Sequence, residues 1–320
     1  MRCIWMALSV VGGAVLLLVA SQPPPEAAAN PMTAPAGPPT LAELKNATYA
    51  GFEAPASPVT LKDGLWEGEP LQPGGTSRPS VSLGGDFHLL GDLDGDGAEE
   101  AVVVLAQSSG GSGTFDYLAV VKRNDHGLEN VATTALGDRV QLRAARIENG
   151  KLVVSGVRAG EEDARCCPGE LVEWEWVLQG GTLIASAAPR KTGRLSLDAL
   201  AGTEWVLRGW GFNDPAPSEP EVTLTYQDGR FAGTSGCNRY VGSAQAGEMP
   251  GDLAVGPTAG TRMACPEPQS AVEARFLTQL GGAKKFGFLL GQLAVSYQTE
   301  GGVWGTMLFE GRPPARAAKP

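Results

Sequence analysis

Histidine is scarce in this chain of 320 residues, which contains only His88 and His126. The two lie far apart in the sequence, and neither has a partner at the spacing of metal ligands. A histidine-based metal site or a Ser-His-Asp triad needs several convergent groups, so this scarcity argues against both. The chain also lacks Gly-x-Ser-x-Gly, His-Glu-x-x-His, P-loop and dinucleotide-binding motifs. We therefore expect that the protein is not an enzyme.

Blocks of lysine and arginine are also missing, and the formal net charge is -10. Binding to nucleic-acid phosphates needs a concentrated basic face. The composition therefore argues against a nucleic-acid partner and favours a soluble protein or a protein that binds cations.

Glycine and proline, in contrast, are abundant, with 44 and 24 residues. Both favour short strands joined by many turns over long helices. The length suffices for about two domains, each with its own core. We predict a mainly β protein with two β-rich domains.

The N-terminus resembles a secretory signal. Arg2 precedes an apolar run at residues 4–20, and the alanines at positions 27–29 offer a signal-peptidase site. We predict a signal peptide at residues 1–29, and the alternative is an uncleaved anchor, because the run is nearly long enough to span a bilayer. In both interpretations the chain is exported to the periplasm, the cell surface or the medium. The chain would contact the membrane only through this segment, and only if the segment stays uncleaved.

A segment rich in proline and alanine follows, and we predict a tether over residues 30–56. Within it, a short helix is expected from Leu41, with Thr40 as its N-cap.

Residues 57–186 are predicted to form the first β-rich domain. Short apolar stretches alternate with Asp-Gly, Gly-Gly and Asn-Gly turn signals, of which Asn149-Gly150 is typical of a type I' hairpin. The expected strands cover residues 59–61, 65–67, 86–91, 101–106, 114–123, 139–148, 151–158, 171–178 and 182–185.

An acidic loop at residues 92–100 separates two of these strands. Carboxylates at alternate positions let the backbone curl so that their oxygens converge on one hard cation. The predicted calcium ligands are the side chains of Asp92, Asp94, Asp96 and Glu100 and the carbonyl of Ala98.

Calcium is the one cofactor that the sequence suggests, and a second interpretation of the loop stays open. An EF-hand is excluded by Val103, which stands where a bidentate glutamate is required. The strand-flanked loop is instead similar to the acidic loop of FG-GAP-like repeats. Aspartate and glycine also form turns without any ion, so a solvated acidic turn explains the same pattern.

Cys166 and Cys167 are neighbours and precede Pro168 between two predicted strands. In an exported protein such cysteines can bond to each other or to another cysteine, and we expect a structural disulfide rather than a redox site, because the Cys-x-x-Cys spacing is absent. Together with the acidic loop, this motif resembles an uncharacterised domain of bacterial exported proteins over residues 80–183. That resemblance carries no activity.

A second domain is predicted at residues 197–310, after a polar linker at 187–196. It opens with Gly-Thr-Glu-Trp-Val-Leu, continues with Gly-Thr-Ser-Gly-Cys-Asn-Arg-Tyr-Val-Gly at residues 233–242, and then carries Thr-Arg-Met-Ala-Cys-Pro at 261–266. An amphipathic helix is expected near residues 271–280, and alternating apolar residues at 293–297 indicate a strand. The order of these motifs is similar to the META domain, the family of the bacterial heat-shock protein HslJ.

This resemblance implies a compact antiparallel β domain with one packed helix and no catalytic residues to transfer. The family motif residues here are Gly236, Cys237, Asn238, Arg262, Met263 and Cys265. We interpret this cluster as turn chemistry, with a small polar ligand site as the alternative. A disulfide between Cys237 and Cys265 is expected in an oxidising compartment. Trp205, Trp210 and Trp304 are expected in the core, and residues 311–320 are predicted to form a disordered tail.

The sequence therefore predicts an exported bacterial envelope protein that acts as a binding, structural or stress-related module. Its partner would be an envelope protein or a small ligand. Two rival classes stay open. A secreted hydrolase would draw on groups such as His88 and Asp92, and a protease inhibitor would use a constrained loop such as residues 166–168.

Overall fold

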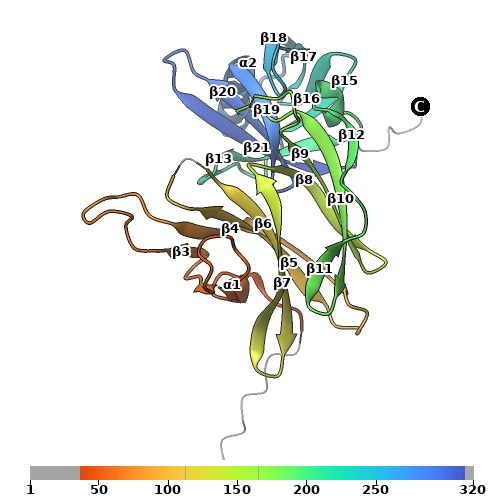
Figure 1. The fold of residues 1–320 in the computed structure, drawn as a ribbon. Helices are drawn as coiled ribbons and strands as arrows, with labels where there is room; N and C mark the ends of the chain where they lie inside the picture. Colours follow the sequence, from red (N-terminus) through yellow and green to blue (C-terminus); the bar gives the residue numbers. More distant parts are fainter. Residues whose placement is uncertain (1–36, 112, 165, 314–320) are drawn as a thin grey trace, which may run out of the picture. The chain divides into compact units, whose positions relative to one another are not determined.

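The computed structural model describes residues 37–111, 113–164 and 166–313. The predicted signal peptide, the start of the tether and the end of the tail lie outside these residues. The protein is mainly β, as expected, and its strands form antiparallel sheets (Figure 1). No helix within the described residues is long and apolar enough to cross a membrane.

The described residues before 196 form one short helix and strands that make up three sheets. The elements are α1 (Leu41–Leu44), β1 (Thr48–Tyr49), β2 (Val59–Thr60), β3 (Leu65–Glu67), β4 (Ser80–Gly91), β5 (Glu100–Ser108), β6 (Phe115–Asn124), β7 (Gly127–Asp138), β8 (Gln141–Glu148), β9 (Lys151–Arg158), β10 (Glu170–Gln179), β11 (Thr182–Ala185) and β12 (Arg190–Arg194).

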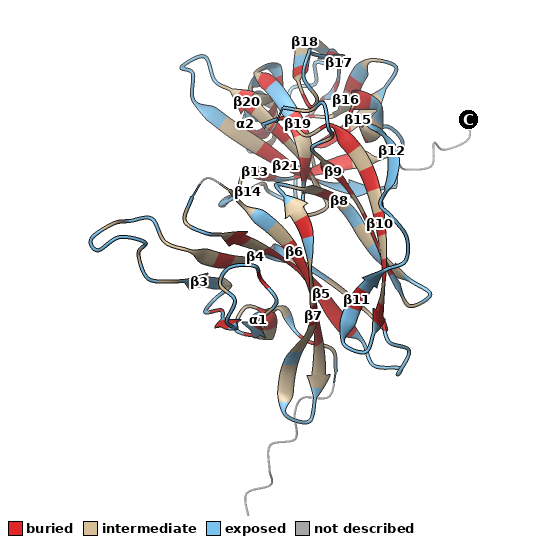
Figure 2. Cartoon of the chain, in the orientation of Figure 1, coloured by how far each residue is buried: buried red, intermediate tan, exposed pale blue. Residues whose placement is uncertain are grey.

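Two five-stranded sheets form the body of this part. One has the order β3-β4-β5-β6-β7, and in the other β11-β10-β9-β8 is extended by β12, which pairs with β10. A core of buried side chains from both sheets, including Val102, Leu118, Leu152 and Trp174, packs between them. Figure 2 shows the buried residues along the strands and the exposed ones mostly at the turns.

Strand β5 explains why the apolar run at residues 101–106 has no alternation. Val102 and Val104 contribute to the core between the sheets, whereas Val103 and Leu105 contribute to a second core on the opposite face. A strand that is covered on both faces needs apolar residues at every position.

The second core corrects the prediction of a tether up to residue 56. Leu44, Tyr49 and Phe52 are buried against the outer face of β5 and β6, and the Tyr49 hydroxyl donates to the Leu44 carbonyl at 2.9 Å. The predicted helix start is present, with Thr40 as the N-cap in a reciprocal capping box. The high proline and alanine content of the segment suggested a tether, although its few large apolar residues are enough to pack it against the sheet.

The predicted linker contains structure as well. Residues 190–194 form β12, which pairs with β10 through backbone hydrogen bonds. At the other end of the second part, Gly311 and Arg312 belong to the last strand rather than to a tail, and Arg312 forms ion pairs with Glu204 and Glu221. The tail prediction therefore began too early in the sequence.

The described residues after 196, up to residue 313, form nine strands and one long helix. The elements are η1 (Leu197–Leu200), β13 (Glu204–Gly211), β14 (Asp214–Pro215), β15 (Thr223–Gln227), β16 (Arg230–Thr234), β17 (Arg239–Ala246), β18 (Leu253–Gly260), α2 (Gln269–Gly281), β19 (Ala283–Leu289), β20 (Gln292–Gln298) and β21 (Trp304–Arg312).

These strands form one antiparallel sheet that curls back on itself. The order is β18-β17-β16-β15-β13-β21-β20-β19, so β18 and β19 lie at its two ends, and the short β14 pairs with β13. An isolated bridge between Asp252 and Lys285 joins these two ends. We call this junction the seam of the sheet.

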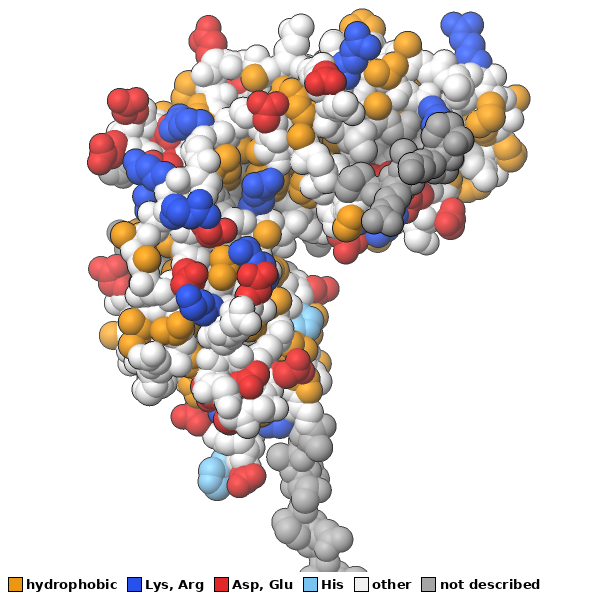
Figure 3. Space-filling view, turned by 90° about the vertical axis from the view of Figure 1, so that its right-hand side faces the viewer, with side chains coloured by type: hydrophobic (Ala, Val, Ile, Leu, Met, Phe, Trp, Pro, Cys, Tyr) orange, Lys and Arg blue, Asp and Glu red, His pale blue; other side chains and the backbone are white. Residues whose placement is uncertain are grey.

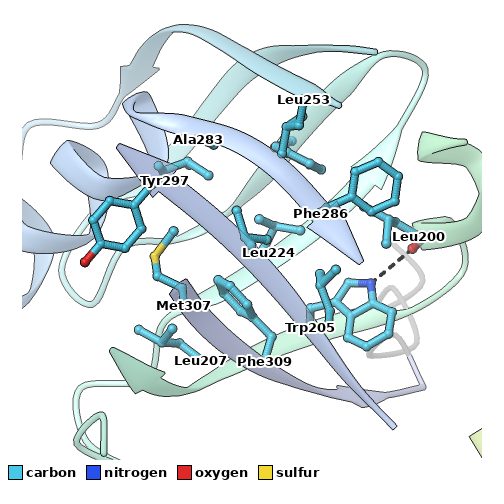
Figure 4. Close-up of a cluster of buried hydrophobic side chains, with 14 of the residues drawn as sticks. Leu200, Trp205, Leu207, Leu224, Leu253, Ala283, Phe286, Tyr297, Met307 and Phe309 are labelled. Atoms are coloured by element: carbon cyan, nitrogen blue, oxygen red, sulfur yellow. Dashed lines mark hydrogen bonds between the residues drawn. The ribbon is translucent and has the colours of Figure 1, made fainter. Parts of the chain in front are cut away.

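The core inside the curled sheet is aromatic and aliphatic (Figure 4). Trp205 is 4% exposed, and its indole N–H donates to the Leu200 carbonyl at 3.2 Å. The amphipathic helix is confirmed as α2, whose Val272, Phe276 and Leu280 are buried.

One of the three expected core tryptophans is not in the core. Trp205 and Trp210 are buried as predicted, but Trp304 is 55% exposed. It is the first residue of β21, where the strand pairs with Gln298 near the end of β20. The end of a hairpin lies beyond the core, so the apolar character of a strand does not bury its first residue.

Candidate functional site

The motif at residues 233–242 contains the end of β16, a tight bend and the start of β17. Gly236 lies in the bend with φ +99°, and a side chain there would approach Val272 of α2 to 2.9 Å. Gly233 lies within β16 instead, where a Cβ atom would come within 2.1 Å of the Thr223 carbonyl oxygen. Gly236 is therefore required by the backbone conformation of the bend, and Gly233 by the close approach of the neighbouring strand.

Asn238 is the centre of a hydrogen-bond network that joins the two motifs. Its Oδ1 accepts from the Met263 N–H at 2.8 Å and from the Thr261 hydroxyl at 2.7 Å. Its Nδ2 donates to the Met263 carbonyl at 3.3 Å and to Glu273 Oε1 at 3.1 Å. The side chain is buried, and its amide uses both its acceptor and its donor capacity inside the protein.

Glu273 completes this network, and the sequence did not reveal it. Glu273 lies outside the apolar stripe of α2, a position that favours solvent, but its Oε2 accepts from the Ser235 hydroxyl at 2.7 Å and from the Asn238 N–H at 2.8 Å. The one signal in the sequence was the position of Glu273 directly after Val272, at the edge of the buried stripe of the helix. A pattern of apolar residues cannot distinguish a solvated carboxylate from one that is bound to polar groups of another element.

The network sets the pKa of Glu273. Burial raises this pKa, but the hydrogen bonds from Ser235 and Asn238 together outweigh burial, so the pKa lies below its usual value. The ionised network therefore stabilises the fold above the pKa of the unfolded chain, and this contribution is lost as the pH falls through the lower pKa of the folded protein.

We expect the Glu273→Gln variant to lose part of the pH dependence of stability. Urea unfolding at pH 7 and at pH 3 should show a smaller difference in the free energy of unfolding for the variant than for the unchanged protein. Glu300→Gln, at an exposed carboxylate of the same domain, is the matched control and should leave the difference unchanged. An equal pH dependence in all three proteins would contradict this assignment.

A disulfide between Cys237 and Cys265 joins the same two motifs, as the sequence predicted, with a Cα–Cα distance of 6.2 Å. Between these anchors, Met263 is 60% exposed, and Arg262 and Arg239 are exposed as well. The motif residues thus divide into a buried set that fixes the loop at residues 261–266 and an exposed set that this loop presents. We call residues 261–266 the motif loop.

The acidic loop between β4 and β5 is shaped by its own carboxylates. Asp92 accepts from the Gly95 N–H at 2.7 Å and from the Gly97 N–H at 3.0 Å. Asp96 accepts from the Ala98 N–H at 2.8 Å. These bonds give the tight curl that the alternating carboxylates predicted.

Lys122 of β6 places its ammonium group against this loop. Its Nζ lies 2.6 Å from Asp94 Oδ2, 2.5 Å from Asp96 Oδ2 and 3.6 Å from Glu100 Oε1. Hydrogen bonds to Asp94 and Asp96 raise the pKa of Lys122 above its ordinary value, and the bond from Lys122 lowers the pKa of Asp96. Sequence reasoning missed this lysine, because it lies on a strand well beyond the loop.

Glu100 is the fully buried member of the loop. Its Oε2 accepts from the Leu93 N–H at 2.8 Å, whereas Oε1 has no hydrogen-bond partner. Burial is the main cause that raises the pKa of this carboxyl, and the neighbouring charges of Asp94 and Asp96 also raise it.

Of the predicted calcium ligands, Asp92, Asp94 and Glu100 present oxygen atoms within 4.8 Å of one another. Asp96 shares Lys122 with Asp94, and Ala98 contacts the loop through its N–H. Of the hydrolase candidates, His88 Nδ1 lies 3.0 Å from the Asp86 carbonyl oxygen, and Asp92 accepts hydrogen bonds from the loop backbone. The structural disulfide expected at Cys166 and Cys167 is not formed in this structure, where both carry free thiols.

This domain consists of a curled antiparallel sheet with one packed helix. A disulfide joins its two motifs, and these features together define one class of small β domain. Residues 198–305 match the family model of the META domain, and this part of the chain is a META domain. The resemblance of the first part to an uncharacterised exported domain stays a prediction.

A solved structure described as "NMR structure of the protein from Burkholderia xenovorans" is 28% identical and covers 36% of this chain and 86% of its own, with a TM-score of 0.29. No curated protein matches the chain.

Proposed function

We propose that this protein is a non-enzymatic, exported envelope module whose META domain binds a protein partner through the motif loop. The observation that carries the proposal is the exposure of Met263 on a backbone that is fixed from both sides. The Asn238 amide binds the N–H and the carbonyl of Met263, and the disulfide holds Cys265 two residues later. A loop that is already ordered loses little conformational entropy when it binds.

The chemistry of the exposed residues indicates the kind of partner. A methionine side chain is flexible and polarisable, and therefore adapts to apolar surfaces of different shape. Arg262 is the chain neighbour of Met263, and Arg239 bonds to Thr261 of the motif loop through its backbone. Both arginines are exposed, and their positive charge favours an apolar partner surface with acidic groups at its rim. Acidic and basic side chains are interspersed on the face drawn in Figure 3.

Two observations support export. The apolar N-terminal run is typical of a secretory signal. The disulfide within the META domain suits an oxidising compartment.

Site-specific photo-crosslinking in intact cells tests this function. With the photoreactive residue at position 263 we expect a discrete adduct that is missing with the same residue at position 71, where Leu71 is equally exposed in the first part of the chain. Met263→Asp should reduce recovery of the partner about tenfold, as expected for a central contact residue. Identical adducts from both positions, or none from position 263, would reject the motif loop as the binding site. A protease in the adduct would identify the protein as an inhibitor.

The acidic loop supports a second function, calcium binding in the first domain. A buried carboxylate oxygen without a hydrogen-bond partner lowers the stability of the fold, and Glu100 Oε1 is such an oxygen. It lies 3.6 Å from the ammonium group of Lys122, which also contacts Asp94. In this structure the ammonium group of Lys122 supplies the positive charge. Calcium prefers several carboxylate oxygens, and Asp92, Asp94 and Glu100 offer oxygens that lie within 4.8 Å of one another.

If calcium binds there, it competes with Lys122. We expect calorimetric titration to show calcium binding at millimolar concentrations or below, and Lys122→Met to bind about tenfold more tightly because no ammonium group must leave. Glu100→Gln should abolish the heat, whereas Glu99→Gln, at the exposed neighbour, should preserve it. Absence of heat in both the unchanged protein and Lys122→Met would show that the loop is a solvated turn.

A further inference from the structure

Cys166 and Cys167 lie side by side in the segment between β9 and β10, and they differ in their surroundings. Cys166 is exposed, whereas Cys167 is buried, and both are free. A hydrogen bond between the two thiols is the main cause that raises the pKa of Cys167, and burial adds to it. The exposed thiol is therefore the one that reagents reach first, and the buried thiol retains its proton beside it.

A cation from the META domain contacts the buried sulfur. Lys285 Nζ lies 3.8 Å from Cys167 Sγ and 3.1 Å from Asp252 Oδ1. Its charge counteracts the raised pKa of Cys167 by favouring the thiolate. Because Lys285 and Asp252 form the bridge at the seam, the cysteine pair lies against the place where the curled sheet closes.

Chain geometry decides between a structural and a labile disulfide for this pair. Consecutive Cα atoms are about 3.8 Å apart across a trans peptide, whereas disulfides usually join Cα atoms about 4.4 to 6.8 Å apart. A bond between neighbouring cysteines is therefore strained and more easily reduced than one between distant residues. Cys237 and Cys265, with a Cα–Cα distance of 6.2 Å, lie within the usual range.

We propose that Cys166 and Cys167 form a reversible dithiol–disulfide site, distinct from the structural disulfide and supported by Lys285. The co-reactant is a small disulfide, RSSR. The Cys166 thiolate attacks one sulfur of RSSR, so that the Cys166–SR bond forms, the S–S bond of RSSR breaks, and the released thiolate takes up a proton. Cys167 then loses its proton to solvent and attacks Cys166 Sγ, which forms the bond between the cysteines and releases the second thiol. Two protein thiols are oxidised, and one RSSR is reduced to two RSH.

Lys285 acts in the second step. Ring closure requires the Cys167 thiolate, and the ammonium group at 3.8 Å from its sulfur stabilises that negative charge. Asp252 in turn holds the lysine in place through their ion pair. This assignment is independent of the partner-binding function and of the calcium function proposed above.

The experiment is a redox titration of the full-length protein in glutathione buffers of graded ratio. After the free thiols are blocked with N-ethylmaleimide, mass spectrometry of the peptide that contains residues 166 and 167 gives its redox state. The reduced pair should appear as a peptide with two N-ethylmaleimide groups. The oxidised pair should appear as an unblocked peptide that is two mass units lighter than the dithiol, because it has lost two hydrogen atoms. The conversion should occur at ratios where Cys237 and Cys265 remain bonded.

Kinetic controls separate the role of Lys285 from general effects on folding. Lys285→Met should slow ring closure about five- to tenfold at neutral pH, with a smaller deficit at higher pH where Cys167 ionises without help. Lys284→Met, at the neighbouring exposed lysine, should leave the rate unchanged. Cys166→Ser should leave Cys167 as a single thiol without a closed ring.

Three results would overturn the proposal. One is a pair that stays fully blocked at every glutathione ratio. Another is a bond between these cysteines that survives when Cys237 and Cys265 have been reduced. The third is an equal effect of the two lysine substitutions on a protein whose near-ultraviolet circular dichroism is unchanged.

Discussion

Asn238→Ala is expected to lower the free energy of unfolding by about 2 to 4 kcal/mol. The substitution removes the acceptor of the Met263 N–H and of the Thr261 hydroxyl, and it removes a donor to Glu273. Each polar group that stays buried without a partner costs about 1 to 3 kcal/mol, and water that enters the space offsets part of the sum. Urea unfolding followed by tryptophan fluorescence measures the loss, because Trp205 lies in the META core.

The matched control is Asn213→Ala, at an exposed asparagine of the same domain, which should change stability by no more than about 0.5 kcal/mol. An equal, small effect of both substitutions would contradict the central role of Asn238. If Asn238 instead served a polar ligand, the variant would keep its stability and lose only binding.

Loss of the disulfide between Cys237 and Cys265 is the second large effect that we expect. The bond joins residues 28 positions apart, and closure of a loop of that length in the unfolded chain corresponds to about 3 to 4 kcal/mol. The double variant Cys237→Ser with Cys265→Ser should therefore unfold at clearly lower urea concentration than the unchanged protein. The free energy of unfolding of the double variant should also fall more steeply with urea concentration if its unfolded chain is more expanded.

Cys166→Ser is the control for this comparison, because it removes an exposed sulfur outside the disulfide. Unchanged protein that has been fully reduced with dithiothreitol should match the double variant. A double variant that is as stable as the unchanged, oxidised protein would show that the Asn238 network alone holds the motif loop.

Local patterns predicted most strands and the long helix, since each of these elements buries one face or both. The hairpin at Asn149-Gly150 formed as expected, with positive φ at both residues. The alternation at Leu293, Val295 and Tyr297 placed all three in the core. Segments with few apolar residues were predicted less well, and residues 40–56 were assigned to a tether although Leu44 and Tyr49 are fully buried.

The sites were predicted less completely than the fold. Spacing identified the acidic loop and the motif cysteines, because these residues lie close together in the sequence or within recognisable motifs. Lys122, Glu273 and Lys285 were missed, since each reaches its site from a different element. Only side-chain contacts across elements reveal such partners.

The sequence by itself determined that this protein is mainly β, that it carries a META domain and that two cysteines of its motifs form a pair. These properties follow from local periodicity, turn residues and motif order, which each short segment carries on its own. Tertiary structure decided what the polar residues do. Packing of α2 against the bend turns Glu273 into a structural anchor, pairing of β6 with β5 brings Lys122 to the acidic loop, and closure of the seam sets Lys285 against Cys167.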